Sequence, residues 1–426
     1  MSVRSDWDVL VIGAGPAGLA AAAEAADNGA SVAVIEREER PGGILKQCIH
    51  DGFGLLRYGE KLTGPEYAWR CISLVEEKNI PILTDTYLNS GSRTGDGFTL
   101  DLVNSREGEF NLRAKALVFA TGCRERTARQ VFIHGTRPAG VLTAGLAQYF
   151  INIQGYMPGK KCVLLGSGDI GLIMARRLVL EGAEVEGVYE ILPEPSGLIR
   201  NVVQCLEDYR IPLHLSSTVL RVHGRDRVEG VTIISVDDRR RPLPGTERYI
   251  PCDSLILSVG LIPENECAQA LGAGIDRVTL GPEVDQSFMS VGQNGVFSCG
   301  NALHVSDLVD YVSDTGDKAG AAAARYALTG ACGQNRRRLV PFRAGQGVRY
   351  VVPQYIDQDS PEEPLIFFRS SESLEDVRVR ITSGSEIVLE KAYPVLRPPE
   401  MERIRAELPE TADEFTLSVD WKGAPR

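Results

Sequence analysis

Two glycine-rich turns of the same design occur in this chain, and each could hold the phosphates of a dinucleotide. The first contains Gly13, Gly15 and Gly18, between a buried strand predicted for residues 8–12 and an alanine-rich helix predicted for residues 16–28. In such a turn the first glycine permits the bend, the second lets a pyrophosphate approach the backbone, and the third lets the helix pack on the strand. The helix N-terminus then presents N–H groups and a positive dipole end to the phosphates.

An acidic residue, Glu36, follows the next predicted strand, residues 31–35. A carboxylate at this place can accept hydrogen bonds from the hydroxyls of an adenosine ribose. Because strand, turn, helix and acid all have the required spacing, we interpret the unit as a dinucleotide site rather than a chance loop. The residues assigned to it directly are Gly13, Gly15, Pro16, Ala17, Gly18, Glu36 and Arg37.

The second turn has the same anatomy, with strands predicted for residues 161–165 and 183–189 and a helix for residues 170–181. Glu190 ends this unit, and an acid there favours NAD(H), whereas NADP(H) would require a cation. The alternative is a degenerate copy that binds nothing, but the glycines and the acid are intact. The assigned residues are Gly166, Gly168, Asp169, Ile170, Gly171 and Glu190.

Composition excludes several other classes of protein. The 426 residues carry a formal net charge of −11, which argues against a nucleic-acid partner. No apolar run approaches the roughly 20 residues of a membrane span. The first strand is expected within about ten residues of the start, which leaves no room for a signal peptide. Nine cysteines without a framework spacing favour the cytoplasm.

Three further segments carry a family resemblance: KALVFATGCRER (115–126), DSLILSVGLIPEN (253–265) and the glycine-asparagine segment of residues 294–330. With the two turns they resemble the pyridine nucleotide-disulfide oxidoreductases, over about residues 6–330. The resemblance implies FAD in the first site and NAD in the second, with the nicotinamide exchanging hydride with the flavin. It adds Gly43, Ala120, Thr121, Gly122, Gly300, Asn301 and Leu308 to the flavin site, with a helix beginning near Leu308. The family has aspartate where this chain has Asn301, whose amide can still bond a ribityl hydroxyl.

Residues 41–68 carry a closer resemblance, to a bacterial subgroup associated with a glycerol-3-phosphate dehydrogenase-like flavoprotein and to the alpha subunits of heteromeric amine, opine and hydrogen-cyanide-forming dehydrogenases. It implies a partner flavoprotein, and an iron–sulfur subunit, beside a small-molecule substrate. The chain would then be either the NAD(H)-linked enzyme or an electron relay whose substrate is oxidised on another chain. No C-x-x-C pair for disulfide reduction occurs, and only Cys332 lies beyond residue 300, so an iron–sulfur cluster would need other cysteines.

Cys48 and His50 follow the Gly-Gly turn that lies along the flavin in the family, so they are the candidate catalytic residues. A thiolate could attack the flavin, or peroxide as in a peroxidase, and a histidine could move a proton. The alternative is that Cys48 is a packed residue and His50 holds the loop. Asp307, Asp310 and Asp314 are expected on one helix face, which favours a solvated face or a helix cap at Ser306 over a metal site. We expect no metal.

The expected fold is α/β, with two Rossmann-like domains and a small all-β domain. The flavin domain is discontinuous, at residues 1–139 and 263–330, and the NAD domain occupies 140–262. Antiparallel meanders are predicted near residues 94–122 and 221–253. Short strand-like runs in residues 331–426 predict a β domain for docking or oligomerisation, with residues 398–408 as a helical or looped insert. We expect an oligomer.

Overall fold

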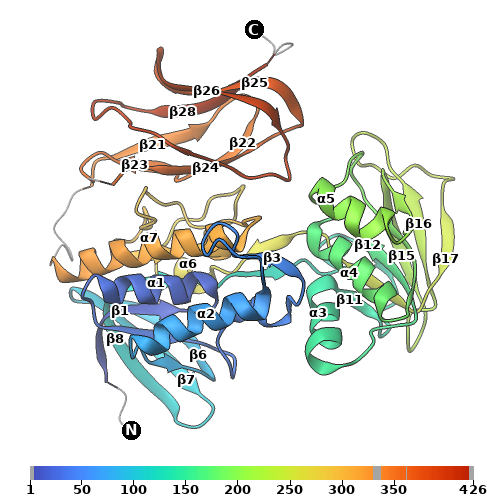
Figure 1. Ribbon diagram of the computed structural model, residues 1–426, viewed down its shortest axis with the longest axis horizontal. Coiled ribbons are helices and arrows are strands. Elements are labelled where there is room, and N and C mark those ends of the chain that lie inside the picture. Colours follow the sequence, from blue (N-terminus) through green and yellow to red (C-terminus); the bar gives the residue numbers. More distant parts are fainter. Residues whose placement is uncertain (1–3, 330–336, 361, 422–426) are drawn as a thin grey trace. The chain divides into compact units, whose positions relative to one another are not determined.

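The computed structural model describes residues 4–329, 337–360 and 362–421, and the chain divides into two compact units (Figure 1). The first unit comprises Met1–Cys123 and Pro263–Arg426, and the second comprises Arg124–Ile262. Residues 124–139 therefore group with the second unit, and the C-terminal β region groups with the first. The boundary expected between residues 330 and 331 lies outside the described residues.

A mixed sheet forms the centre of the first unit, with strand order β5-β2-β1-β8-β7-β6 and β20 paired to β8. The centre of its parallel part is buried, because residues 9–12 of β1 and all of β2 are apolar and pack on both faces. The antiparallel strands β6, β7 and β8 confirm the first predicted meander. The strands are β1 (Asp6–Ile12), β2 (Val32–Ile35), β5 (Ile82–Leu83), β6 (Thr86–Thr94), β7 (Gly97–Asn104), β8 (Gly108–Phe119) and β20 (Val296–Ser298).

Two helices lie side by side on this sheet: α1 (Pro16–Asp27) and α7 (Val309–Leu328) (Figure 1). Their backbones approach closely, because a Cβ on Gly316 or Gly320 would lie 2.2 Å from the carbonyl oxygen of Ala17 or Ala21. Helix α7 begins directly after Leu308, as predicted. The remaining elements of this part are helix α2 (Gly64–Glu77) and the short elements η1 (Gly43–Gln47), β3 (Asp51–Phe53), β4 (Leu62–Thr63), α6 (Glu266–Ala270) and η4 (Gly300–Ala302).

The second unit contains a parallel sheet with strand order β11-β18-β12-β13-β14. Its core joins this sheet to helix α4, through residues such as Leu164, Leu172 and Met174. An antiparallel sheet, β15 to β17 with β10 at its edge, confirms the second predicted meander. The elements are β9 (Cys123–Glu125), β10 (His134–Gly135), β11 (Val141–Thr143), α3 (Ala144–Tyr149), η2 (Phe150–Gln154), β12 (Lys161–Leu165), α4 (Asp169–Leu180), β13 (Glu184–Tyr189), α5 (Ile199–Val202), η3 (Val203–Glu207), β14 (Leu213–His214), β15 (Ser217–His223), β16 (Gly230–Ser235), β17 (Arg248–Pro251), β18 (Ser254–Leu257) and β19 (Leu261–Pro263).

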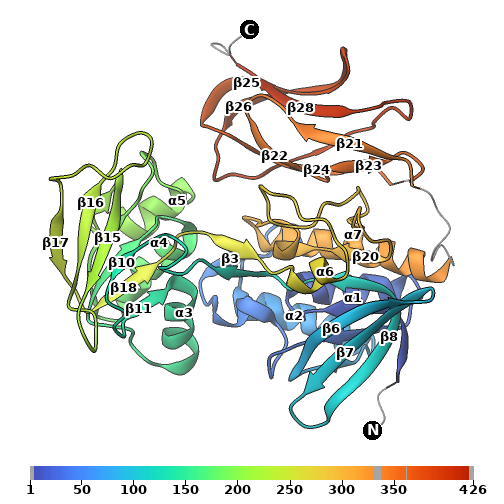
Figure 2. The same cartoon turned by 180° about the vertical axis from the view of Figure 1, so that it is seen from behind.

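The C-terminal region is an all-β sandwich, as predicted, with strand orders β23-β21-β28-β25-β26 and β22-β24-β27 (Figures 1 and 2). The insert expected at residues 398–408 is not helical, because Glu402–Arg405 forms β27 and pairs with β24. The pairing of β27 with β24 and the burial of Ile404 in the sandwich core override the local preference of these residues for a helix or loop. The strands are β21 (Leu339–Ala344), β22 (Val348–Val352), β23 (Tyr355–Asp357), β24 (Leu365–Ser370), β25 (Leu374–Ser383), β26 (Glu386–Leu396), β27 (Glu402–Arg405) and β28 (Phe415–Asp420).

The sandwich packs on the rest of the first unit. Val352, Phe367 and Met401 share an apolar cluster with α1 and α7. A buried ion pair joins Arg337 to Asp285 at 2.7 Å, with side chains 7% and 2% exposed. No helix of the described residues is long and apolar enough to cross a membrane.

Candidate dinucleotide-binding sites

The first glycine turn has the geometry of a phosphate cradle. Gly13 has a φ of 104°, and a Cβ there would lie 2.5 Å from the carbonyl oxygen of Ala120. A Cβ on Gly18 would lie 1.8 Å from the carbonyl oxygen of Gly13, so this position must be glycine for α1 to pack on β1. A Cβ on Gly15 would meet nothing within 4 Å. The space beside Gly15 at the start of α1 therefore fits a pyrophosphate.

Glu36 lies at the end of β2 and is 7% exposed. Its carboxylate accepts hydrogen bonds from the backbone N–H groups of Ala14 and Glu38, both at 2.8 Å. These two bonds orient the carboxylate toward the turn and use about half of its roughly four lone-pair positions. The remaining positions can accept ribose hydroxyls, so the residues present here fit the adenosine half of FAD.

The segments that the resemblance assigned to the flavin meet near this turn. A Cβ on Gly43, at the start of η1, would lie 3.0 Å from the Cα of Gly15. Gly300 has a φ of 60°, and its N–H donates to the Thr315 hydroxyl at 2.8 Å. Asn301 accepts from the backbone N–H of Ser306 at 3.0 Å and donates to the Cys123 sulfur at 3.6 Å. A Cβ on Gly300 would lie 2.7 Å from the Ala17 Cβ, so Gly43 and Gly300 both lie close to the start of α1.

The residues after β8 are tied to the strand that returns from the second unit. The Thr121 hydroxyl donates to the carbonyl of Glu264 at 2.5 Å, and the Glu264 N–H donates to the carbonyl of Gly122 at 3.0 Å. Arg37 forms an ion pair with the Glu264 carboxylate at 3.2 Å. Arg37, assigned to cofactor binding from sequence, is here directed to a protein carboxylate at the surface.

Cys48 carries a protonated thiol at neutral pH. Burial raises the pKa of Cys48 to about 12, and its thiol donates to the Ile44 carbonyl at 3.4 Å. The nucleophile and metal ligand in cysteine chemistry is the thiolate, so these surroundings argue against an adduct or a sulfenic acid at this position. The ring of His50 packs against Phe53, with ring centroids 5.0 Å apart.

The aspartates of the α7 region are engaged by other parts of the first unit. Asp310 is 3% exposed and accepts from the backbone N–H of Arg57 at 2.8 Å. Asp314 pairs with Arg403 at 2.9 Å, and Asp307 accepts from the Met401 N–H at 2.6 Å. Within the described residues no group of three His, Cys, Asp or Glu is placed to hold a metal. Asp307 lies before the first residue of α7, so the three aspartates do not share a helix face as expected, and together they bind the loop after β3 and the β sandwich to the α7 region.

The second turn has the same geometry as the first, and its glycines pack against Ser258. A Cβ on Gly166 would lie 2.0 Å from the Ser258 carbonyl oxygen, and Gly171 donates its N–H to the Ser258 hydroxyl at 3.1 Å. A Cβ on Gly168 would have the Ser258 hydroxyl at 3.3 Å, so this cradle is narrower than the one at Gly15. Sequence patterns alone did not identify Ser258. Its position could have identified it, because Ser258 directly follows β18 just as Ala120 directly follows β8.

Glu190, 4% exposed, accepts four hydrogen bonds. The backbone N–H groups of Ser167 and Leu192 donate at 2.9 and 3.1 Å, and the hydroxyls of Ser167 and Ser196 donate at 2.6 and 2.9 Å. Asp169, assigned to cofactor binding, accepts from the Leu198 N–H at 2.9 Å and from the Asn201 amide at 2.7 Å. Asp169 therefore anchors the loop after β13, and Ile170 lies in the first turn of α4.

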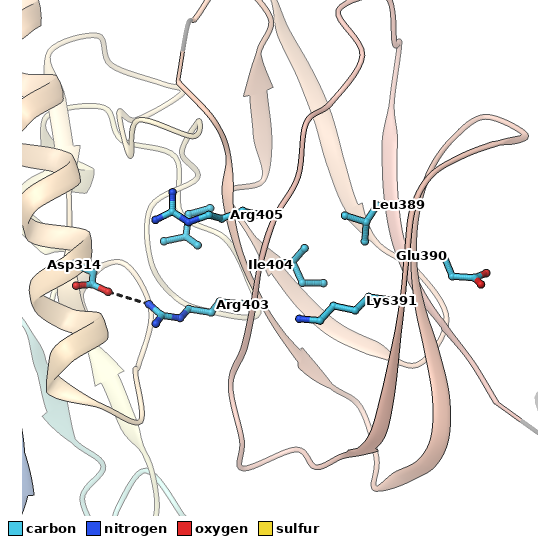
Figure 3. Close-up of a pocket in the computed structure, with 8 residues that line it drawn as sticks. Asp314, Leu389, Glu390, Lys391, Arg403, Ile404 and Arg405 are labelled. Atoms are coloured by element: carbon cyan, nitrogen blue, oxygen red, sulfur yellow. Dashed lines mark hydrogen bonds and ion pairs between the residues drawn. The ribbon is translucent and has the colours of Figure 1, made fainter. Parts of the chain in front are cut away.

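A further cavity of about 550 Å³ lies in the first unit and is lined by residues of β26 and β27 and by Asp314 of α7 (Figure 3). Lys391 and Arg403 extend toward the α7 side, whereas Glu390 points away from it. The lining residues are Asp314, Leu365, Leu389, Glu390, Lys391, Arg403, Ile404 and Arg405. Charged side chains of both signs line this cavity beside three apolar ones, and Arg405 pairs with the Glu363 carboxylate at 3.5 Å.

Comparison with known proteins agrees with this anatomy. The chain is 30% identical over 295 residues to an opine oxidase subunit of Agrobacterium tumefaciens strain Ach5, covering 64% of this chain and 56% of that protein. It is 28% identical over 284 residues to the hydrogen cyanide synthase subunit HcnB of Pseudomonas aeruginosa, covering 62% and 59%. The chain thus spans little more than half the length of these curated relatives. The alpha subunit of sarcosine oxidase from a Corynebacterium strain is 28% identical over 279 residues, which are 61% of this chain and 27% of that protein.

Solved structures show the same fold. Thioredoxin reductase of T. acidophilum superposes with a TM-score of 0.61 at 23% identity, covering 76% of this chain and 99% of that chain. Thioredoxin reductase of Lactococcus lactis gives 0.62 at 19% identity, with the same coverage. The model of the family described as pyridine nucleotide-disulphide oxidoreductase matches residues 7–324. The chain therefore belongs to the pyridine nucleotide-disulphide oxidoreductase family.

Proposed function

We propose that this chain exchanges hydride between NAD(H) and FAD, and passes electrons to or from a small molecule or a partner dehydrogenase subunit. The observation that carries the proposal is that one chain holds two units in which a glycine turn is followed by a buried glutamate, Glu36 in the first and Glu190 in the second. We call these the turn-and-acid units. Bound FAD would supply the redox chemistry. The chain's own part is to hold each dinucleotide by its turn and to direct the N-terminus of α7 at the flavin.

A second candidate is an electron-relay subunit of a heteromeric amine, opine or glycerol-3-phosphate dehydrogenase, with the substrate oxidised on another chain. Two observations favour it. Glu190 already accepts four hydrogen bonds within the chain, and the relatives described above are themselves subunits. A stand-alone peroxidase using Cys48 is the weakest candidate, because burial keeps that thiol protonated.

The C-terminal sandwich is proposed as the surface for assembly with a partner subunit. Strands β26 and β27 each end their sheets and have no further neighbour within the described residues. Such edges can pair with an added strand, and Lys391, which lines the cavity beside β26, would suit an acidic residue on it. Within the described residues no two cysteines form a disulfide, which suits our proposal that the protein works in the cytoplasm.

The test uses the purified full chain and the visible absorption band of the flavin. Under anaerobic conditions, added NADH should bleach this band in the wild type. Glu190→Gln should slow the bleaching while the band itself stays, since FAD is held by the other unit. The matched variant Glu36→Gln should lose bound FAD instead. If NADH leaves the band unchanged, and a partner with its substrate bleaches it, the relay is the better description.

A further inference from the structure

The carboxylates that end the two turn-and-acid units are bonded differently. Glu36 accepts from two backbone N–H groups, that of Ala14 in the turn and that of Glu38 two residues on. Glu190 accepts the corresponding pair, from Ser167 and Leu192. It also accepts two hydroxyls, from Ser167 and Ser196, on the same oxygen that takes the Ser167 N–H.

The two extra hydroxyls come from positions that lack them in the first unit. Counting from the acid, Pro41-Gly42-Gly43 corresponds to Pro195-Ser196-Gly197, and within the turns Ala14 corresponds to Ser167. The second loop is tied down further, because the Ser196 N–H donates to the Ser167 hydroxyl at 2.9 Å. Asp169 fixes its far end through Leu198 and Asn201, so Ser196 is held over the carboxylate from both sides.

We propose that the hydroxyl of Ser196 occupies the place of an adenosine ribose hydroxyl on Oε2 of Glu190, so that NAD(H) bonds both oxygens of this carboxylate only by displacing it. Ser196 then sets the affinity of this unit for the dinucleotide. A carboxylate oxygen offers about two acceptor positions, and Oε2 of Glu190 already takes three donors, whereas Oε1 takes only the Leu192 N–H. A ribose that bonds both oxygens must therefore displace a donor from Oε2, whereas each oxygen of Glu36 takes one donor and has an open position. The inference rests on the proposed function, since it concerns the same site.

Three substitutions at one position test the idea in the FAD-loaded full chain. Ser196→Gly copies Gly42, Ser196→Ala removes only the hydroxyl, and Ser196→Thr keeps a hydroxyl. The dissociation constant of NAD⁺ is measured by calorimetry, which needs no turnover. Glycine and alanine should each tighten binding about tenfold, the value of one net hydrogen bond to a charged group, while threonine should stay near the wild type. Retained flavin colour shows that each variant is folded.

A second ligand identifies the contact. The NAD⁺ analogue that lacks both hydroxyls of the adenosine ribose should bind the wild type and Ser196→Ala equally, because it has nothing to gain from a vacated carboxylate. Equal NAD⁺ affinity in the wild type, alanine and glycine proteins would overturn the inference and leave the proposed function standing. If neither NAD⁺ nor NADH binds any variant, and NADH never bleaches the flavin, the proposed function fails and the inference fails with it.

Discussion

Two neighbouring glycines of the first turn should respond in opposite ways to the same small change. Gly15 has a φ of −77° and a ψ of −178°, which any residue can adopt, and a Cβ there meets nothing within 4 Å. Gly18 faces the carbonyl oxygen of Gly13, 1.8 Å from where its Cβ would lie, and the Ala120 Cβ at 3.1 Å. There is therefore open space beside Gly15, which a ligand can occupy, and there is none beside Gly18.

Gly15→Ala should therefore change the free energy of unfolding of the FAD-free chain by no more than about 1 kcal/mol. A lower backbone entropy in the unfolded chain contributes roughly 0.4–1 kcal/mol in favour, and a poorer helix N-cap offsets it by a similar amount. FAD should bind about ten- to a hundredfold more weakly, because a methyl group inserted against a close-fitting ligand costs about 1–3 kcal/mol.

Gly18→Ala should instead destabilise the chain itself by about 3 kcal/mol or more, because α1 must move away from β1. Urea unfolding followed by circular dichroism, on protein stripped of FAD, measures the first quantity. Titration with FAD, followed by quenching of its fluorescence, measures the second. The reasoning is refuted if Gly15→Ala is as unstable as Gly18→Ala, or if it binds FAD as tightly as the wild type.

Three further predictions follow from buried groups. Burial, with help from the Arg369 cation, lowers the pKa of His304 to about 3, so the unfolded chain binds an extra proton below about pH 6.5. Stability should be complete above that pH and fall by about 2 kcal/mol toward pH 5, a loss that His304→Leu should remove from urea unfolding curves; equal pH dependence in both proteins would contradict this. Arg337→Met should cost about 3–5 kcal/mol in the same assay, because it leaves the Asp285 carboxylate buried without its cation; a loss below about 1 kcal/mol would show that the pair contributes little. Cys48→Ser should leave the anaerobic reduction of the flavin by NADH at the wild-type rate, since the thiol is protonated; stopped-flow traces that slow markedly would restore a role for the sulfur.

Much of the fold can be read from local patterns. The two turns are recognisable because glycines at these spacings permit the bend and the close packing of the helix on the strand. These requirements of the backbone depend little on distant residues. The meanders and the β sandwich are predicted by segments of strand length in which apolar and polar residues alternate, separated by turn residues. Residues 398–408 go against their local pattern, because β24 supplies the pairing that makes Glu402–Arg405 a strand.

The chemistry of individual side chains is decided by tertiary structure. Cys48 is a nucleophile candidate in sequence, and only the fold shows that desolvation raises the pKa of its thiol instead of lowering it. The aspartates of α7 form one acidic face in sequence, and only the fold brings Arg403 to Asp314 across 89 residues. Ser167 and Ser196 lie 23 and 6 residues from Glu190, on opposite sides of it in the sequence. A sequence determines which groups exist and which local turns they can form, but acceptor capacity and ionisation depend on which distant donors and apolar atoms surround each group, and folding alone assembles those surroundings.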